Sequence, residues 1–119
     1  MTLNTLTLDV RDQIAWVTLT RPEKRNAINS HMMRELLTLW QQASETDWRC
    51  VVLTGAGERA FCAGADLAER DGLTTETWQA QHAVLQQAMR AMLACPVPII
   101  GAINGAAYGG GTELTLACD

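Results

Sequence analysis

Two short, wholly apolar segments constrain the fold of this chain most. "CVVLT" (50–54) and "PIIGAI" (98–103) are rich in aliphatic residues, and each follows a stretch in which apolar residues recur at helical spacing. Strands that are apolar on both faces are typical of parallel sheets, whose faces are both covered. The alternation of such strands with amphipathic helices therefore predicts an α/β fold.

The remaining segments predict a hairpin and three helices. Alternating apolar residues over 6–10 and the β-branched run 14–20 predict an N-terminal β-hairpin. Helical spacing predicts one helix that is capped by Ser30 and reaches Ala43, and another from about Glu76 to Ala94. A third helix is expected to begin at Gly109.

Composition predicts one domain over residues 1–119 with no second domain, because 119 residues that are 48% hydrophobic can bury a core. The net charge of −4 gives no support for a nucleic-acid or membrane-surface partner. The first residues lack the basic and apolar layout of a signal peptide, and the apolar runs are far shorter than a membrane span. A cytoplasmic location is the default expectation.

The cysteines predict neither a disulfide framework nor a metal site. No C-x-x-C pair occurs, the two histidines are far apart, and the four cysteines are widely separated: Cys50, Cys62, Cys95 and Cys118. Their apolar neighbours favour small buried thiols in a reducing compartment. A nucleophilic role for Cys62 stays as an alternative, although no histidine lies near it in sequence.

The loops that follow the strands are candidates for the functional site. "GAGERAFCAGADL" (55–67) and "NGAAYGGGTEL" (104–114) are rich in glycine and alanine, and ligands collect outside the carboxyl ends of strands in α/β sheets. An amide N–H from each loop could converge on one oxygen as an oxyanion hole, and the second would gain the helix dipole. Glu113 lies three residues beyond Gly110 and is a candidate acid/base.

Simpler interpretations of these residues remain open. Glycine runs often serve only tight turns or close helix packing. A glutamate in the first helical turn often makes only a favourable contact with the helix dipole.

Three ordered motifs resemble the successive signatures of the crotonase, or enoyl-CoA hydratase/isomerase, superfamily. They are "RPEKRNAIN" (21–29), "FCAGADL" (61–67) and "NGAAYGGGTELTLACD" (104–119), and together they extend over most of the chain. The resemblance implies a crotonase-like ββα-spiral fold that binds an acyl-CoA thioester. Coenzyme A would be part of the substrate, and no permanently bound cofactor is expected.

The resemblance also implies roles for individual residues. The backbone amides of Ala65 and Gly110 would hold the thioester oxygen, and Glu113 matches the first of two glutamates that hydratases use as acid and base. Candidates for binding coenzyme A are Lys24, Arg25 and Ala27 for its nucleotide, and Ala63, Ala65, Asp66, Leu67, Ala68 and Gly110 along its path. The basic cluster "RPEKR" suits phosphate groups, but it is equally explained as a solvated surface turn.

Members of this superfamily continue well beyond the last motif. The expectation is therefore the amino-terminal part of a crotonase, truncated before the remaining spiral turns, the second glutamate and the helical trimerisation region. The complete protein is expected to form a homo-oligomer, a trimer or hexamer. The 119-residue chain alone is expected to expose apolar surface, to self-associate and to lack hydratase activity.

The function implied for the complete protein is that of an enoyl-CoA hydratase, a lyase that adds water to 2,3-unsaturated acyl-CoA thioesters. Another crotonase reaction is the alternative among enzymes: isomerisation, dehydration of a carnitinyl-type thioester, or thioester hydrolysis. A non-catalytic acyl-CoA-binding or subunit-interaction fragment is the alternative from another class.

Overall fold

The strands form two sheets in a computed structural model that describes residues 2–119. The larger sheet has the order β1-β2-β3-β5, and the smaller one pairs β4 with β6. β1 and β2 are antiparallel, and every other strand pair is parallel. The strands are β1 (Leu6–Arg11), β2 (Ile14–Leu19), β3 (Cys50–Gly55), β4 (Ala60–Cys62), β5 (Ile99–Gly101) and β6 (Ala106–Ala107). The predicted α/β class, the hairpin and the two parallel strands are confirmed.

The hairpin turn is made by Asp12 and Gln13, which both have positive φ, 52° and 65°. Two such residues are typical of a type I′ turn, whose twist matches that of the strands it joins. β2 then enters the interior, because it pairs with β1 on one side and β3 on the other. The side chains of Ala15, Val17 and Leu19 on β2 are fully buried.

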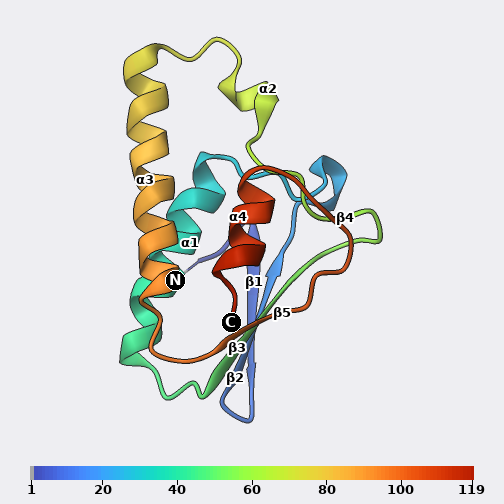
Figure 1. Cartoon of the computed structure of the whole chain (residues 1–119), viewed down its shortest axis with the longest axis vertical. Coiled ribbons are helices and arrows are strands. Elements are labelled where there is room, and N and C mark those ends of the chain that lie inside the picture. Colours follow the sequence, from blue (N-terminus) through green and yellow to red (C-terminus); the bar gives the residue numbers. More distant parts are fainter. Residues whose placement is uncertain (1) are drawn as a thin grey trace.

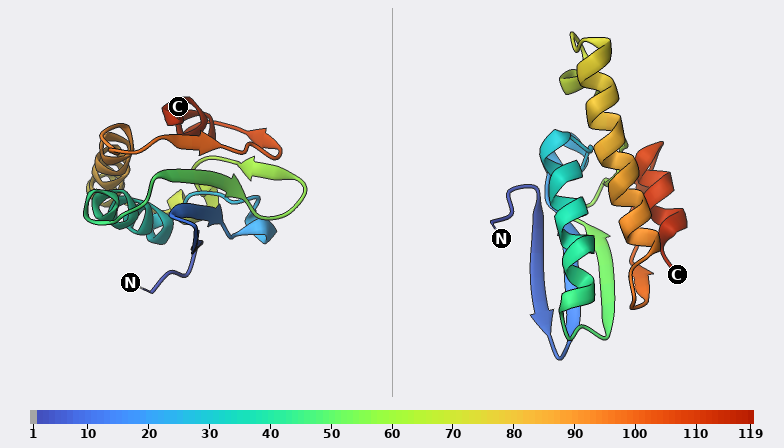
Figure 2. Two further views of the ribbon diagram at one scale, coloured as in Figure 1. Left: turned by 90° about the horizontal axis from the view of Figure 1, so that it is seen from below. Right: turned by 90° about the vertical axis from the view of Figure 1, so that its left-hand side faces the viewer.

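Two long helices cover one face of the larger sheet. In Figures 1 and 2, α1 and α3 lie side by side next to the strands, while α4 lies beyond β5. Leu36, Leu39 and Met92 on these helices and Leu53 of β3 belong to one cluster of buried residues. The helices are α1 (Ser30–Gln42), α2 (Leu67–Arg70), α3 (Thr75–Leu93) and α4 (Gly110–Ala117), with 3₁₀ turns η1 (Pro22–Lys24) and η2 (Ala43–Glu45).

The helix boundaries differ slightly from expectation. Ser30 is the first residue of α1, and the cap is Asn29, whose side-chain oxygen accepts the Met32 N–H at 2.9 Å. Thr74 caps α3 by accepting the Thr77 N–H at 3.1 Å, so that helix begins at Thr75. Both caps satisfy amides that a helix N-terminus leaves without a partner.

Apolar side chains are exposed around β5 and α4. Ile100 is 53% exposed, Leu116 is 78% exposed, and Ile103 lies just after β5. β5 is an edge strand of the larger sheet. An exposed apolar patch beside a sheet edge favours association with further polypeptide.

The three consecutive glycines at the start of α4, from its N-cap Gly109 to Gly111, serve different needs. Gly109 has φ +50° and ψ −117°, a conformation that suits glycine and is strained for other residues. Gly111 packs directly on β4, because a Cβ atom added there would lie 2.1 Å from the Cys62 carbonyl oxygen. A Cβ on Gly110 would lie 3.1 Å from the terminal methyl group of Ile28 and at an ordinary contact distance, 3.9 Å, from the Gly64 Cα atom. Turn formation and close packing thus explain Gly109 and Gly111, and they leave Gly110 free for another role.

We predict that Gly111→Ala lowers the free energy of unfolding by about 3 kcal/mol, because the new methyl group would overlap β4 backbone, which cannot rotate away. Gly110→Ala is the matched control, because the Ile28 side chain can yield and alanine favours helix by about 1 kcal/mol. Urea denaturation of both variants measures the difference. Equal stability of the two variants would contradict the close packing of Gly111.

Candidate active site

The segments that follow β4 and β6 meet at the N-terminus of α4. A Cβ atom added to Gly64 would lie 2.7 Å from the Tyr108 carbonyl oxygen and 3.4 Å from the Gly110 nitrogen. The two backbones are therefore in direct contact, although more than 40 residues separate them in sequence. Glycine at position 64 permits this approach.

A short parallel bridge between Ile28 and Ala65 orients the first loop. The Ile28 N–H donates to the Gly64 carbonyl at 2.7 Å, and the Asp66 N–H donates to the Ile28 carbonyl at 2.9 Å. In a parallel ladder, these two bonds use the groups on either side of Ala65 and leave its own N–H pointing the other way. Ala65 itself is exposed.

Both candidate oxyanion donors have free N–H groups. Within residues 2–119, neither the Ala65 amide nor the Gly110 amide donates a hydrogen bond to another protein group. Gly110 is the first residue of α4, where a helix leaves amides without intrahelical partners and carries a partial positive charge. Two free donors are thus held next to each other, one of them at a helix terminus.

A cavity of about 270 Å³ contains both residues and Glu113. Glu113 lies in the first turn of α4, and its backbone N–H donates to Gly109 at 3.0 Å. Its carboxylate is exposed and has no ion-pair or hydrogen-bond partner in the described chain, 2–119. The other lining residues are Ile28, Met33, Asp66, Glu69, Arg70, Trp78, Gln81, His82, Leu85 and Gly109.

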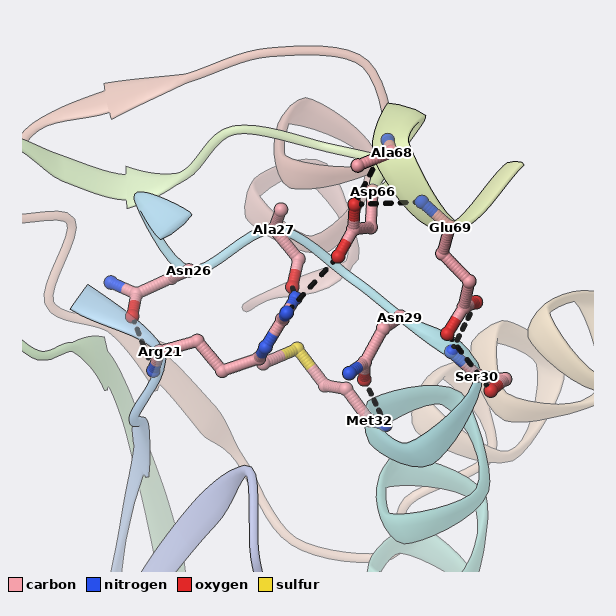
Figure 3. Close-up of polar contacts among 9 residues, drawn as sticks. All are labelled: Arg21, Asn26, Ala27, Asn29, Ser30, Met32, Asp66, Ala68 and Glu69. Atoms are coloured by element: carbon pink, nitrogen blue, oxygen red, sulfur yellow. Dashed lines mark hydrogen bonds and ion pairs between the residues drawn. The ribbon is translucent and has the colours of Figure 1, made fainter. Parts of the chain in front are cut away.

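An ion pair that sequence reasoning missed supports the Ala65 loop. The Arg21 guanidinium donates to Asp66 at 3.0 Å and to the Ala27 carbonyl at 2.6 Å, as Figure 3 shows. The side chains of the pair are only 14% and 12% exposed. Arg21 thereby joins the loop before Ile28 to the loop that carries Ala65.

The carboxylates of Asp66 and Glu69 both accept hydrogen bonds from other groups of the protein. The Asp66 carboxylate accepts the amide N–H groups of Ala68 and Glu69, at 3.1 and 3.2 Å, and so caps α2. Glu69 accepts the Ser30 amide at 2.8 Å and the Ser30 hydroxyl at 3.1 Å (Figure 3). Of the three carboxylates on the cavity wall, Glu113 is the one without such partners among residues 2–119.

Asn26 fixes the beginning of the same loop. It is completely buried, its side-chain oxygen accepts the Arg21 N–H at 2.9 Å, and its amide donates to the carbonyls of Ala56 and Ala60. Its φ of 57° is one that asparagine tolerates better than most residues. The Arg-Asn pair at 21 and 26 gave no periodic signal in the sequence, since both act through contacts with distant segments.

The pKa of the Asp66 carboxyl is held below its ordinary value of 3.8. Burial raises this pKa, but the Glu69 amide, the Arg21 guanidinium and the Ala68 amide together outweigh burial. A lowered carboxyl pKa contributes stability above the pKa of the unfolded chain, and the contribution is lost as pH falls through the folded value. The relevant window lies below about pH 4.

We predict that Asp66→Asn lowers the unfolding free energy by about 1.5–3 kcal/mol at neutral pH, because a hydrogen-bonded ion pair is lost. The difference from the unsubstituted protein should narrow below about pH 4. Asp9→Asn is the control, because the Asp9–Arg11 pair has side chains that are 65% and 62% exposed and should contribute little. Chemical denaturation across this pH range measures both, and a pH-independent difference would contradict the ion-pair contribution.

The residues expected to bind the nucleotide of coenzyme A are only partly brought together. Lys24, Arg25 and Ala63 line a second hollow of about 600 Å³, together with Pro22, Glu23 and Arg59. Arg59, which follows β3, is a third cation that sequence reasoning missed. Ala27 does not line this hollow and is 8% exposed. On α2, Leu67 and Ala68 are exposed to solvent.

The cysteines are less buried than expected. Cys62 is fully buried, whereas Cys50, Cys95 and Cys118 are partly exposed. Burial raises the pKa of the Cys62 thiol and outweighs a hydrogen bond with the Gly64 backbone, which lowers it. A buried thiol with a raised pKa is a poor nucleophile, so the structure argues against that alternative.

No cluster of three or more histidine, cysteine, aspartate or glutamate side chains that could hold a metal ion occurs within residues 2–119. Across the same described range, every helix is too short or too polar to cross a bilayer.

The architecture is that of the crotonase fold. The solved structure of an enoyl-CoA hydratase from Bacillus anthracis superposes with a TM-score of 0.93 at 40% identity, over 98% of this chain and 46% of that one. A family model described as enoyl-CoA hydratase/isomerase matches residues 9–119. The chain therefore belongs to the enoyl-CoA hydratase/isomerase family.

Curated relatives lead to the same family. The chain is 40% identical to an (E)-benzylidenesuccinyl-CoA hydratase from Thauera aromatica, over 96% of its own length and 44% of the relative's. It is 34% identical to a short-chain-enoyl-CoA hydratase from Clostridium acetobutylicum, over 100% of its own length and 46% of the relative's. The chain thus spans less than half the length of these relatives.

Proposed function

We propose that this chain supplies the oxyanion-binding part of an enoyl-CoA hydratase, which adds water to 2,3-unsaturated acyl-CoA thioesters. The observation that carries the proposal is the pair of free amides, on Ala65 and Gly110, beside the unpartnered carboxylate of Glu113 in one cavity. Backbone donors of this kind stabilise negative charge that develops on a thioester oxygen, and the chain belongs to a family of enoyl-CoA hydratases and isomerases.

In the proposed mechanism, the thioester oxygen accepts hydrogen bonds from the Ala65 and Gly110 amides. Water adds its oxygen to C3, the C2–C3 double bond opens, and negative charge moves to the thioester oxygen. The dipole of α4 stabilises that charge. Glu113 accepts a proton from the water and then delivers it to C2, which completes the addition and regenerates the carboxylate.

Coenzyme A is proposed to lie across both loops as part of the substrate. Lys24 and Arg25 would face its phosphate groups, and Arg59 adds a third cation to the same hollow. Ala63, Leu67 and Ala68 would border its path, together with the backbone of Asp66. The Asp66 carboxylate would not contact it, because Arg21 occupies that group, and Ala27 would act only by supporting the loop.

The active form is proposed to be a cytoplasmic homo-oligomer. The exposed apolar side chains of Ile100 and Leu116 support the oligomer, since such surface is usually covered in a stable protein.

A second candidate reaction is isomerisation of 3-enoyl-CoA to 2-enoyl-CoA. It is favoured by the single unpartnered carboxylate on the cavity wall within residues 2–119, since one carboxylate can take a proton from C2 and return it to C4. A non-catalytic acyl-CoA-binding segment is the third candidate.

Activity assays with two substrates and one binding measurement distinguish the three candidate functions. Hydration removes the enoyl-thioester absorbance of crotonyl-CoA, whereas isomerisation of hex-3-enoyl-CoA creates that absorbance. Both assays are run on the 119-residue chain and on any longer form of the protein that contains it. Calorimetric binding without turnover in any form would support the binding segment, and neither binding nor turnover would exclude all three.

A further inference from the structure

A cation-aromatic cluster forms the wall of the cavity between α2 and α3. The Arg70 guanidinium carbon lies 5.1 Å from the centre of the Trp78 ring, and the Trp78 and His82 rings stack at 5.0 Å with an 8° angle between them. All three residues line the cavity that contains Ala65, Gly110 and Glu113. A guanidinium held on an aromatic face is oriented before any ligand arrives.

This cluster carries positive charge that the described residues do not neutralise. Across residues 2–119, the ion pairs are Asp9 with Arg11 and Asp66 with Arg21, so Arg70 has no carboxylate within 4.0 Å. Its neighbour Glu69 is engaged by Ser30. The cavity therefore offers a free guanidinium on one wall.

The elements that carry the cluster lie on one side of α4, whose first residue is Gly110 (Figure 1). In Figure 1 and the right view of Figure 2, α2 and the first turn of α3, which holds Trp78, lie above α4. Apolar side chains complete the lining: Ile28, Met33 and Leu85. An acyl group with its thioester at Gly110 would meet hydrocarbon walls first and a cation beyond them.

We propose that Arg70 binds a carboxylate at the far end of the acyl group, so that the preferred substrates are CoA thioesters of unsaturated dicarboxylic acids. This inference rests on the proposed function of the same cavity. A planar guanidinium matches a carboxylate with two parallel hydrogen bonds, whereas a purely hydrocarbon chain would leave it without a partner.

The test compares two esters that differ only at the far end: hex-2-enedioyl-CoA, which carries the carboxylate, and hex-2-enoyl-CoA, which does not. Kinetics with the active form of the protein should give a kcat/KM about tenfold higher for the dicarboxylic ester, equivalent to about 1.4 kcal/mol. Arg70→Gln should abolish this preference, and Arg70→Lys, which keeps the charge but not the planar fork, should retain part of it. Arg90→Gln is the matched control, because Arg90 belongs to α3 but does not line the cavity.

The outcomes separate this inference from the function on which it rests. Turnover of both esters without a preference for the dicarboxylate, or a preference that survives Arg70→Gln, would overturn the role of Arg70 and leave the proposed function standing. Failure of the protein to bind or turn over either ester would overturn both. A preference lost equally in Arg70→Gln and Arg90→Gln would show a general charge effect and would also overturn the assignment.

Discussion

Replacement of Glu113 by glutamine is expected to slow hydration of crotonyl-CoA by about 10²–10⁴-fold, the range typical of a positioned acid/base group. Glutamine keeps the size and hydrogen-bonding shape of glutamate but cannot exchange a proton. Binding of acyl-CoA should stay largely intact, because the amides of Ala65 and Gly110 are unchanged. Absorbance kinetics give the rate, and calorimetry with a saturated acyl-CoA gives the affinity.

The control for this variant is Glu76→Gln, which removes an equal charge from the first turn of α3, outside the cavity. It should leave both rate and affinity near their original values. Near-normal turnover of Glu113→Gln would remove this glutamate from the mechanism. A parallel loss of rate in both variants would point instead to the overall charge of the protein.

Gly110→Pro is expected to lower kcat/KM by roughly 10²–10³-fold, since loss of one oxyanion donor costs about 2.7–4 kcal/mol of transition-state stabilisation. Proline removes the N–H group and adds a ring, whose Cβ atom would lie 3.1 Å from the Ile28 side chain. Gly110 is the first residue of α4, where proline is well tolerated because that N–H has no partner in the helix.

Gly110→Ala separates the loss of the N–H group from the effect of the added Cβ atom. Alanine introduces the same Cβ contact with Ile28, at 3.1 Å, but keeps the N–H. We expect it to retain most of the activity that Gly110→Pro loses. Circular dichroism of both variants monitors folding, and a folded, fully active Gly110→Pro protein would defeat the assignment of this amide.

The chain's local patterns were sufficient to predict its class of fold and the two loops of its candidate site. "CVVLT" and "PIIGAI" contain β3 and β5, because apolar β-branched runs are typical of parallel strands, and the helices follow from the spacing of apolar residues along one segment. Such patterns depend only on residues close in sequence, so they predict strands and helices without knowledge of the tertiary structure. The resemblance of three ordered motifs then indicated the family, which the matches over residues 9–119 confirm.

The tertiary structure alone decided which residues meet. Arg21 and Asp66 form an ion pair although they are 45 residues apart in sequence. Position 111 excludes a side chain because the Cys62 carbonyl lies directly against it. No periodic pattern in the sequence predicted the pairing of β4 with β6 or the contact of the Arg70 guanidinium with the Trp78 ring. Periodicity reports only which face of a segment is buried, whereas contacts between distant residues depend on how the backbone brings separate segments together.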